Sequence, residues 1–265
     1  MSSVDPAAVR RIILQQSKRA NVGHIGCALS VADIVACLYG RILRIPSWDA
    51  PDRDRFVLSK GHAALALYSA LALSGHLRQE KLATFCGDGS LLGVHPEHEL
   101  PGVDFSTGSL GSGVTYAVGA ALAARLQRSE RRVYTLLSDG ECNEGSVWEA
   151  VMFAGHHRLA NLTAIVDWNG QQAFGYAAEV MDQRNLPERW RAFGWSVQEV
   201  DGHDSDALAE ALQTPTEQPR AVLARTVFGK GVSFMERELK WHYLPMSDSQ
   251  YAQALDEIGV AAIAA

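Results

Sequence analysis

Two polar segments that follow strand-like runs carry the residue types needed to bind a divalent cation. Asp139 and Gly140 come directly after the apolar run at residues 133–138, and Asn169 follows a second apolar run at residues 162–167. Thirty positions separate Asp139 from Asn169, which is the length of one strand–helix–strand crossover. Because ligands of open parallel sheets bind beyond the carboxyl ends of the strands, we expect the two side chains to face one point if the strands are neighbours.

Magnesium is the cation that best fits this set of oxygens. One carboxylate and one amide oxygen do not complete an octahedral shell, but Mg²⁺ usually takes further ligands from water and bound phosphate groups. The backbone carbonyl of Gln171 could add another ligand, and Gly140 leaves room for a diphosphate to approach the main chain. Either dipeptide alone, Asp139-Gly140 or Asn169-Gly170, would be more typical of a turn. Their joint position after two strands favours a binding site.

Four histidines lie in turns and glycine-rich segments, where they could act on a substrate. His24 lies in a Gly-His-x-Gly turn, His62 stands at an expected helix start, His95 precedes a proline, and His242 follows a tryptophan. Imidazole can donate and accept hydrogen bonds near neutral pH, which suits substrate recognition and proton transfer. His95 also belongs to a long loop at residues 86–113, and long loops in compact domains are usually functional. One such histidine would more often be structural, but four favour a functional role.

The pattern of the whole chain predicts an α/β fold that would position these groups. Helices are predicted at residues 6–20, 63–73, 114–127 and 147–159. A further helix is predicted to begin near Ser30, because Ser30 and Asp33 have capping-box spacing. Strands are predicted at residues 55–59, 133–138, 162–167, 195–200 and 221–227. This alternation predicts an open, mostly parallel sheet with helices on both faces. We find no linker or repeat, so residues 1–265 are expected to form a single domain.

Composition narrows the class of partner and the compartment. The net charge of -6 argues against a nucleic-acid or membrane surface as the main partner, since both favour a basic face. The first twenty residues have no uninterrupted apolar core of a signal peptide, and no run approaches the roughly 18 apolar residues of a membrane span. We therefore expect a cytoplasmic protein. The four cysteines form no Cys-x-x-Cys pair and are expected to be reduced and partly buried, without a zinc or redox role.

The segments around the expected metal site resemble the thiamine diphosphate signature. SDGECNEGSVWEA followed by NLTAIVDWNGQQ is similar to a Gly-Asp-Gly opening with an asparagine one crossover later, although Ser138 replaces the first glycine. The resemblance implies that thiamine diphosphate is the cofactor and that Asp139, Asn169 and the carbonyl of Gln171 bind its magnesium. It also implies that Glu144 matches an acid at a subunit interface.

Four further segments resemble the N-terminal domain of transketolases and extend the likeness over nearly the whole chain. They are NVGHIGCALS, RFVLSKGHAALALYSAL, GVHPEHELPGVDFSTGSLGSG and FGKGVSFMERELKWH. The resemblance implies that His24 and His95 contact a hydroxylated donor substrate, and that His62 and His242 lie near the diphosphate or the reacting centre. Gly108-Ser109-Leu110 matches a family segment that passes close to the cofactor, with serine in place of the usual proline.

The family resemblance also implies a partner. Complete transketolases carry a second α/β domain, which supplies an acid to the cofactor's aminopyrimidine ring and groups that bind the sugar phosphate. We find no such domain in this chain, and therefore expect the N-terminal subunit of a split transketolase. Its partner would carry the pyrimidine-binding domain, in a two-fold α2β2 heterotetramer. The expected reaction transfers a two-carbon ketol unit from a ketose phosphate to an aldehyde. Two alternatives stay open: a thiamine-dependent acyl transferase that uses a 2-oxo acid, and a non-catalytic regulatory subunit.

Overall fold

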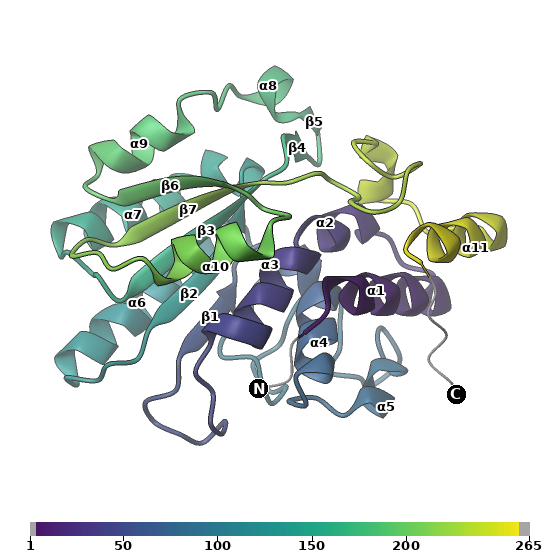
Figure 1. Cartoon of the computed structure of the whole chain (residues 1–265), viewed down its shortest axis with the longest axis horizontal. Coiled ribbons are helices and arrows are strands. Elements are labelled where there is room, and N and C mark those ends of the chain that lie inside the picture. Colours follow the sequence, from purple (N-terminus) through teal and green to yellow (C-terminus); the bar gives the residue numbers. More distant parts are fainter. Residues whose placement is uncertain (1–3, 260–265) are drawn as a thin grey trace.

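The centre of the fold is a five-stranded, wholly parallel sheet, seen in a computed structural model that describes residues 4–259 (Figure 1). The strand order is β1-β2-β3-β7-β6, with β1 Arg55–Leu58, β2 Val133–Ser138, β3 Leu162–Trp168, β6 Ser196–Asp201 and β7 Arg220–Arg225. A separate antiparallel pair joins β4, Gln171–Gln172, to β5, Gly175–Tyr176. The predicted open parallel sheet is therefore confirmed, and each predicted strand lies within two residues of its observed bounds.

The central strands are mostly apolar and buried over nearly their whole length because helices cover both faces of the sheet. All six residues of β2 are buried, as are the first six of β3, which is the pattern expected of doubly covered parallel strands. The register pairs Ser138 with Asp167, and Asp167 in turn with Ala224 of β7. Consequently Asp139 and Asn169, just beyond β2 and β3, lie at the same edge of the sheet.

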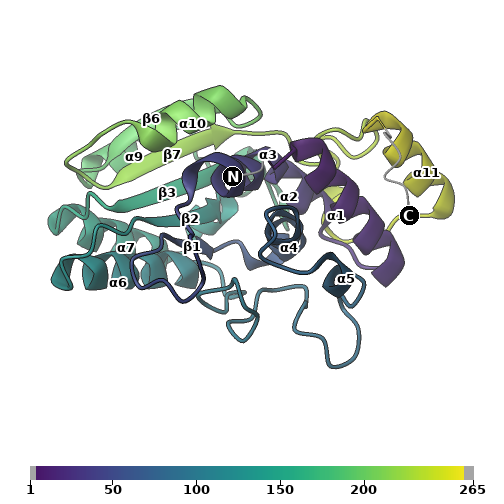
Figure 2. The same cartoon turned by 60° about the horizontal axis from the view of Figure 1, so that its bottom comes forward.

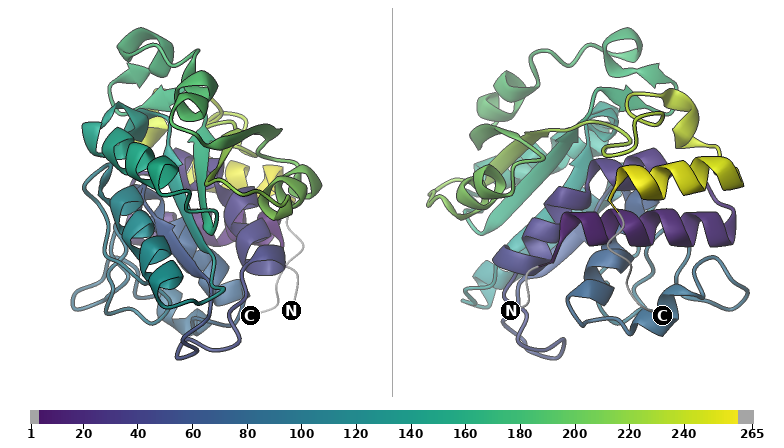
Figure 3. Two further views of the ribbon diagram at one scale, coloured as in Figure 1. Left: turned by 90° about the vertical axis from the view of Figure 1, so that its left-hand side faces the viewer. Right: turned by 45° about the vertical axis from the view of Figure 1, so that its right-hand side comes forward.

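The helices divide into two groups, one on each face (Figures 2 and 3). Side chains of one core cluster come from α1 Pro6–Ala20, α2 Ile25–Ser30, α3 Ala32–Cys37, α4 Ala64–Leu73 and α10 Ser205–Gln213. The other cluster draws on α6 Ser112–Leu126, α7 Gly145–His156 and α9 Leu186–Ala192. Alternate residues of β2 enter the two clusters, Tyr134 and Leu136 on one side and Val133 and Leu137 on the other.

Short helices complete the connections. They are α5 Gln79–Leu82, α8 Ala177–Val180 and α11 Asp248–Glu257, with a π-helical turn at Leu38–Ile42 and 3₁₀ turns at Gly61–Ala63, Gly140–Asn143 and Leu239–His242. Helix α11 packs beside α1 (Figure 3). The segment between α5 and α6 has no helix or strand, only an isolated bridge between Leu92 and Pro96. This agrees with the long loop predicted over residues 86–113.

Helix α3 begins at Ala32, close to the predicted start near Ser30, but the predicted capping box of Ser30 and Asp33 is wrong. Ser30 is instead the last residue of α2, and its hydroxyl donates to Asp167 Oδ1 at 2.7 Å, so it is not available as a cap. Val31 leaves helical geometry at φ -101° and ψ 6° before α3 begins. Asp33 forms an ion pair with Arg10 rather than completing a capping box. A local capping pattern was therefore overridden by tertiary partners that lie far away in the sequence.

All four cysteines are free thiols, as predicted. Cys27, Cys37 and Cys142 are buried, and Cys86 is exposed. Across the described residues, no helix is long and apolar enough to cross a membrane.

Candidate active site

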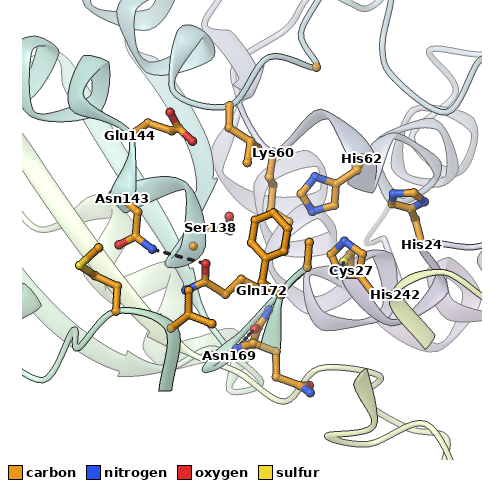
Figure 4. A pocket seen from close by; sticks show the side chains of 18 of the residues that line it. His24, Cys27, Lys60, His62, Ser138, Asn143, Glu144, Asn169, Gln172 and His242 are labelled. Atoms are coloured by element: carbon orange, nitrogen blue, oxygen red, sulfur yellow. Dashed lines mark hydrogen bonds between the residues drawn. The ribbon is translucent and has the colours of Figure 1, made fainter. Parts of the chain in front are cut away.

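A cavity of about 430 Å³ opens at the carboxyl edge of the sheet (Figure 4). It brings together most of the residues singled out in the sequence: His24, His62, His95, His242, Gly108, Leu110, Gly140, Glu144, Asn169 and Gln171. Two of the predicted site residues do not line it. Asp139 lies beneath the cavity with no exposed surface, and Ser109 is exposed beside it. Segments from both ends of the chain therefore build one site.

Asp139 lies against the Asn169 segment, as the two strand ends predict. Its carboxylate accepts the Gly140 N–H at 2.8 Å and the Gly170 N–H at 2.7 Å. A Cβ atom on Gly140 would come within 2.8 Å of the Gln172 side chain. The glycine is therefore required for close packing at this edge as well as for space beside the cavity.

The amide of Asn169 is held in one orientation. Its Oδ1 accepts the Gln171 N–H at 2.9 Å, while its Nδ2 donates to Asp167 Oδ2 at 2.8 Å and to Ser30 Oγ at 3.2 Å. Because Asp167 can only accept hydrogen bonds when ionised, it fixes which end of the amide is the oxygen. Asn169 Oδ1 therefore faces the backbone of Gln171, whose carbonyl is the further oxygen ligand predicted from the sequence.

The charge at this edge fits a bound cation. Burial, together with the neighbouring Asp167, raises the pKa of Asp139 to about 7. No cationic side chain among residues 4–259 forms an ion pair with Asp139. A buried carboxylate without a cation is unfavourable. In the same region, Gln171 Oε1 and Gln172 Nε2 are buried without hydrogen-bond partners. The oxygens of Asp139, Asn169 and Gln171 suit Mg²⁺, and the Gln172 Nε2 amide group could donate to a phosphate oxygen.

Lys60 has a role that no motif indicated: it lines the cavity with its side chain almost wholly buried at 1% exposure. Its ammonium group forms an ion pair with Asp167, which is also fully buried. Burial alone would lower the pKa of Lys60, but the Asp167 carboxylate raises it overall. Ser30 and Thr226 donate to the same carboxylate. The wall of the cavity therefore contains a buried ion pair, held by a network of hydrogen bonds.

Three of the four histidines form a tight group on the wall opposite Glu144 (Figure 4). The ring centroids of His24 and His242 are 5.3 Å apart, those of His62 and His242 5.6 Å, and those of His24 and His62 5.8 Å. His24 has φ +62°, and its N–H donates to the His242 carbonyl at 3.2 Å. A non-glycine residue in this conformation is uncommon, and such residues cluster at functional sites.

These histidines are neutral near pH 7. Burial lowers the pKa of His242 to about 4, with further contributions from His24 and Lys60. Burial also lowers the pKa of His24, and it lowers that of His62 well below its usual value. Each neutral ring keeps one donor and one acceptor nitrogen. The wall can therefore hydrogen-bond to hydroxyl and carbonyl groups without carrying charge.

A second residue that no motif indicated, Glu141, holds the loop that carries Gly108 and Leu110. Its buried carboxylate accepts the Gly111 N–H at 2.7 Å, the Ser59 hydroxyl and the Ser138 N–H at 3.3 Å. Gly111 has φ +84° and a Cβ there would clash with Ser146, so only glycine fits this turn. Glu141 directly follows the Ser-Asp-Gly run, but nothing in the sequence indicated that its side chain is buried.

Apolar residues around β4, β5 and α8 form the open rim of the cavity, and no motif had indicated them. Phe174, Val180 and Met181 line the cavity and are 87%, 38% and 54% exposed. Leu110, on the other side, is 38% exposed. Large side chains of this kind gathered at one cavity are typical of a surface that another molecule covers.

The chain matches the family model for the transketolase thiamine diphosphate-binding domain over residues 4–264. It therefore belongs to the transketolase family. Its fold is that of solved transketolases: the structure from Campylobacter jejuni superposes with a TM-score of 0.91 at 32% identity, covering 97% of this chain and 42% of that one. The chain thus spans less than half the length of that transketolase.

Two relatives of similar length are named as transketolase subunits. The 6-deoxy-6-sulfo-D-fructose transketolase subunit of a Clostridium species is 40% identical, over 94% of this chain and 93% of its own length. An apulose-4-phosphate transketolase subunit from Phocaeicola vulgatus is 38% identical, over 94% and 90%. These matches confirm the predicted family, the thiamine diphosphate-binding domain and the transketolase-type enzyme class.

Proposed function

We propose that this chain is the diphosphate-binding subunit of a two-component transketolase. The enzyme would transfer a two-carbon ketol unit from a ketose with an anionic terminal group to an aldehyde acceptor. The observation that carries this proposal is the convergence of four histidines on one cavity beside the Asp139–Asn169 edge. The two relatives of similar length support it, since their names specify a sulfonated ketose and a ketose phosphate.

Asp139, Asn169 Oδ1 and the Gln171 carbonyl would hold Mg²⁺, with Gly140 leaving space for the diphosphate. Thiamine diphosphate supplies the carbanion chemistry when it is bound. The buried ammonium of Lys60, paired with Asp167, lines the same cavity and could also face the diphosphate. The protein's part is thus to balance the diphosphate charge within a largely buried region.

The histidines would recognise the donor. His24 and His95 are assigned to the hydroxyls of the ketose, and His62 and His242 to the diphosphate or the reacting centre. Imidazole rings suit these tasks, because they offer both a donor and an acceptor nitrogen when neutral. A site built this way disfavours a donor that lacks the hydroxyl, since its polar groups would be left unpaired.

A partner subunit with the pyrimidine-binding domain would close the cavity in a cytoplasmic α2β2 assembly. Support comes from the exposed apolar rim at Phe174, Val180 and Met181, and from relatives that are themselves named as subunits. The exposed side chain of Glu144 borders the same opening and would lie at this interface. Residues 1–265 would act in the assembly as one domain.

Two other functions remain distinguishable from ketol transfer. A thiamine-dependent acyl transferase would use a 2-oxo acid such as pyruvate, which has no hydroxyl beside its carbonyl. A regulatory subunit would not need the metal-site oxygens and the histidines together, so their joint presence favours catalysis.

Donor preference tests the proposal. Steady-state kcat/KM of the assembled enzyme should be higher for a ketose phosphate than for pyruvate, with thiamine diphosphate and Mg²⁺ in excess. A preference for pyruvate would replace ketol transfer by the acyl-transferase function. If an assembly in which both Asp139 and Asn169 are substituted catalysed the reaction normally, this chain would have only a regulatory role.

A further inference from the structure

One cavity-lining histidine has an unusual neighbour. The Cys27 sulfur lies 3.4 Å from His242 Nδ1, and both side chains line the cavity (Figure 4). Both residues are buried, Cys27 at 3% and His242 at 8% exposure. The His242 ring also lies parallel to that of Phe228, with centroids 6.2 Å apart. The His242 imidazole is thus fixed in place. Within residues 4–259, the contact with Cys27 is the only hydrogen bond that this ring makes.

Acceptor strength favours placing the hydrogen between the two atoms on the sulfur. Burial raises the pKa of the Cys27 thiol to about 12, and burial lowers the pKa of His242 to about 4, so both groups are neutral near pH 7. One hydrogen atom is therefore shared between sulfur and Nδ1. An imidazole nitrogen is a good acceptor, whereas a thiol sulfur is a weak one. In addition, the described residues offer the Cys27 S–H no other acceptor.

We propose that Cys27 is a positioning residue that fixes His242 as the tautomer with its hydrogen on Nε2. The ring then presents a donor, not an acceptor, to the cavity. His242 would therefore donate to an oxygen of the bound diphosphate or donor substrate, and would not remove a proton. This last assignment rests on the proposed function, whereas the tautomer is a property of the chain alone.

Nitrogen NMR of the full chain labelled with ¹⁵N-histidine tests the tautomer directly. At pH 7.5 the His242 signals should show a protonated Nε2 and an unprotonated Nδ1, with the assignment made by their loss in His242→Gln. In Cys27→Ala a second tautomer should become populated. The pKa of His242 should also rise by up to about one, because the bond that favours the neutral ring is lost. The other titratable groups around the ring stay in every variant: His24, His62, Lys60 and Tyr243.

Cys27→Ser keeps a donor and should restore the parent tautomer, while Cys37→Ala, at a buried cysteine in α3, controls for lost packing. In the assembled enzyme, kcat/KM should fall about 3- to 10-fold in Cys27→Ala, recover in Cys27→Ser and stay unchanged in Cys37→Ala.

A parent chain with its hydrogen on Nδ1 would overturn the proposal, as would unchanged His242 signals in Cys27→Ala. The parent spectrum decides this even if Cys27→Ala fails to fold. An Nε2-protonated His242 in an assembly without ketol transfer would refute the proposed function and leave the tautomer standing.

Discussion

Replacing Lys60 by methionine should destabilise the chain strongly, because it leaves the buried Asp167 carboxylate without its cation. Lys60 is 1% exposed and Asp167 has no exposed surface. Removing one partner of such a pair typically costs about 3–5 kcal/mol. Three neutral donors stay with Asp167, namely Ser30, Thr226 and Asn169. We therefore expect the lower end of this range, about 3 kcal/mol.

Urea unfolding followed by circular dichroism measures this loss. With a slope near 3 kcal/mol per molar urea, the midpoint should fall by about 1 M. Lys81→Met is the matched control, because Lys81 is exposed and lies outside every ion pair within residues 4–259, and its midpoint should not move. The double variant Lys60→Met/Asp167→Asn should recover part of the loss, since no buried charge is left unpaired. A midpoint for Lys60→Met within about 0.2 M of the parent would mean that water reaches Asp167 and that the pair is not closed off.

Three further predictions concern the site. Asp139→Ala should abolish Mg²⁺-dependent binding of thiamine diphosphate in calorimetric titration while the circular dichroism spectrum stays that of the parent; unchanged affinity would remove Asp139 from the metal site. His24→Ala and His95→Ala should each lower kcat/KM for a ketose phosphate by roughly 10²-fold or more, with little change in cofactor affinity; normal rates in both would contradict their assignment to the donor. Phe174→Ser should weaken assembly with the partner at least about tenfold in ultracentrifugation, whereas Leu126→Ser, at a similarly exposed side chain on α6, should not; equal affinities would exclude the rim as the interface.

The parallel sheet and the meeting of Asp139 with the Asn169 segment were accessible from sequence because their signals are local. Strands β2 and β3 are mostly apolar runs, and each ends directly before one of the predicted ligands, Asp139 or Asn169. Register in a parallel sheet then places those residues at one edge. The gathering of the four histidines was predicted from family motifs rather than from spacing, and the cavity brings them together.

Other features depend on contacts between distant segments, which no local pattern encodes. Lys60 meets a carboxylate 107 positions away, and Cys27 meets a ring 215 positions away. The same kind of contact explains why the predicted capping box does not form, since the Ser30 hydroxyl donates to Asp167. The apolar rim at Phe174 was missed for a different reason: a single phenylalanine in a polar turn carries no periodicity, and its significance lies in its exposure beside the cavity.

The most direct test of the central claim is to measure ketol transfer by the purified chain before and after a pyrimidine-domain partner is added. Thiamine diphosphate, Mg²⁺, a ketose phosphate donor and an aldehyde acceptor would be present throughout. We predict no turnover by the chain alone, and turnover that rises with added partner until the two chains are equimolar. Robust turnover by the chain alone, with no copurifying protein, would contradict the account of a divided active site.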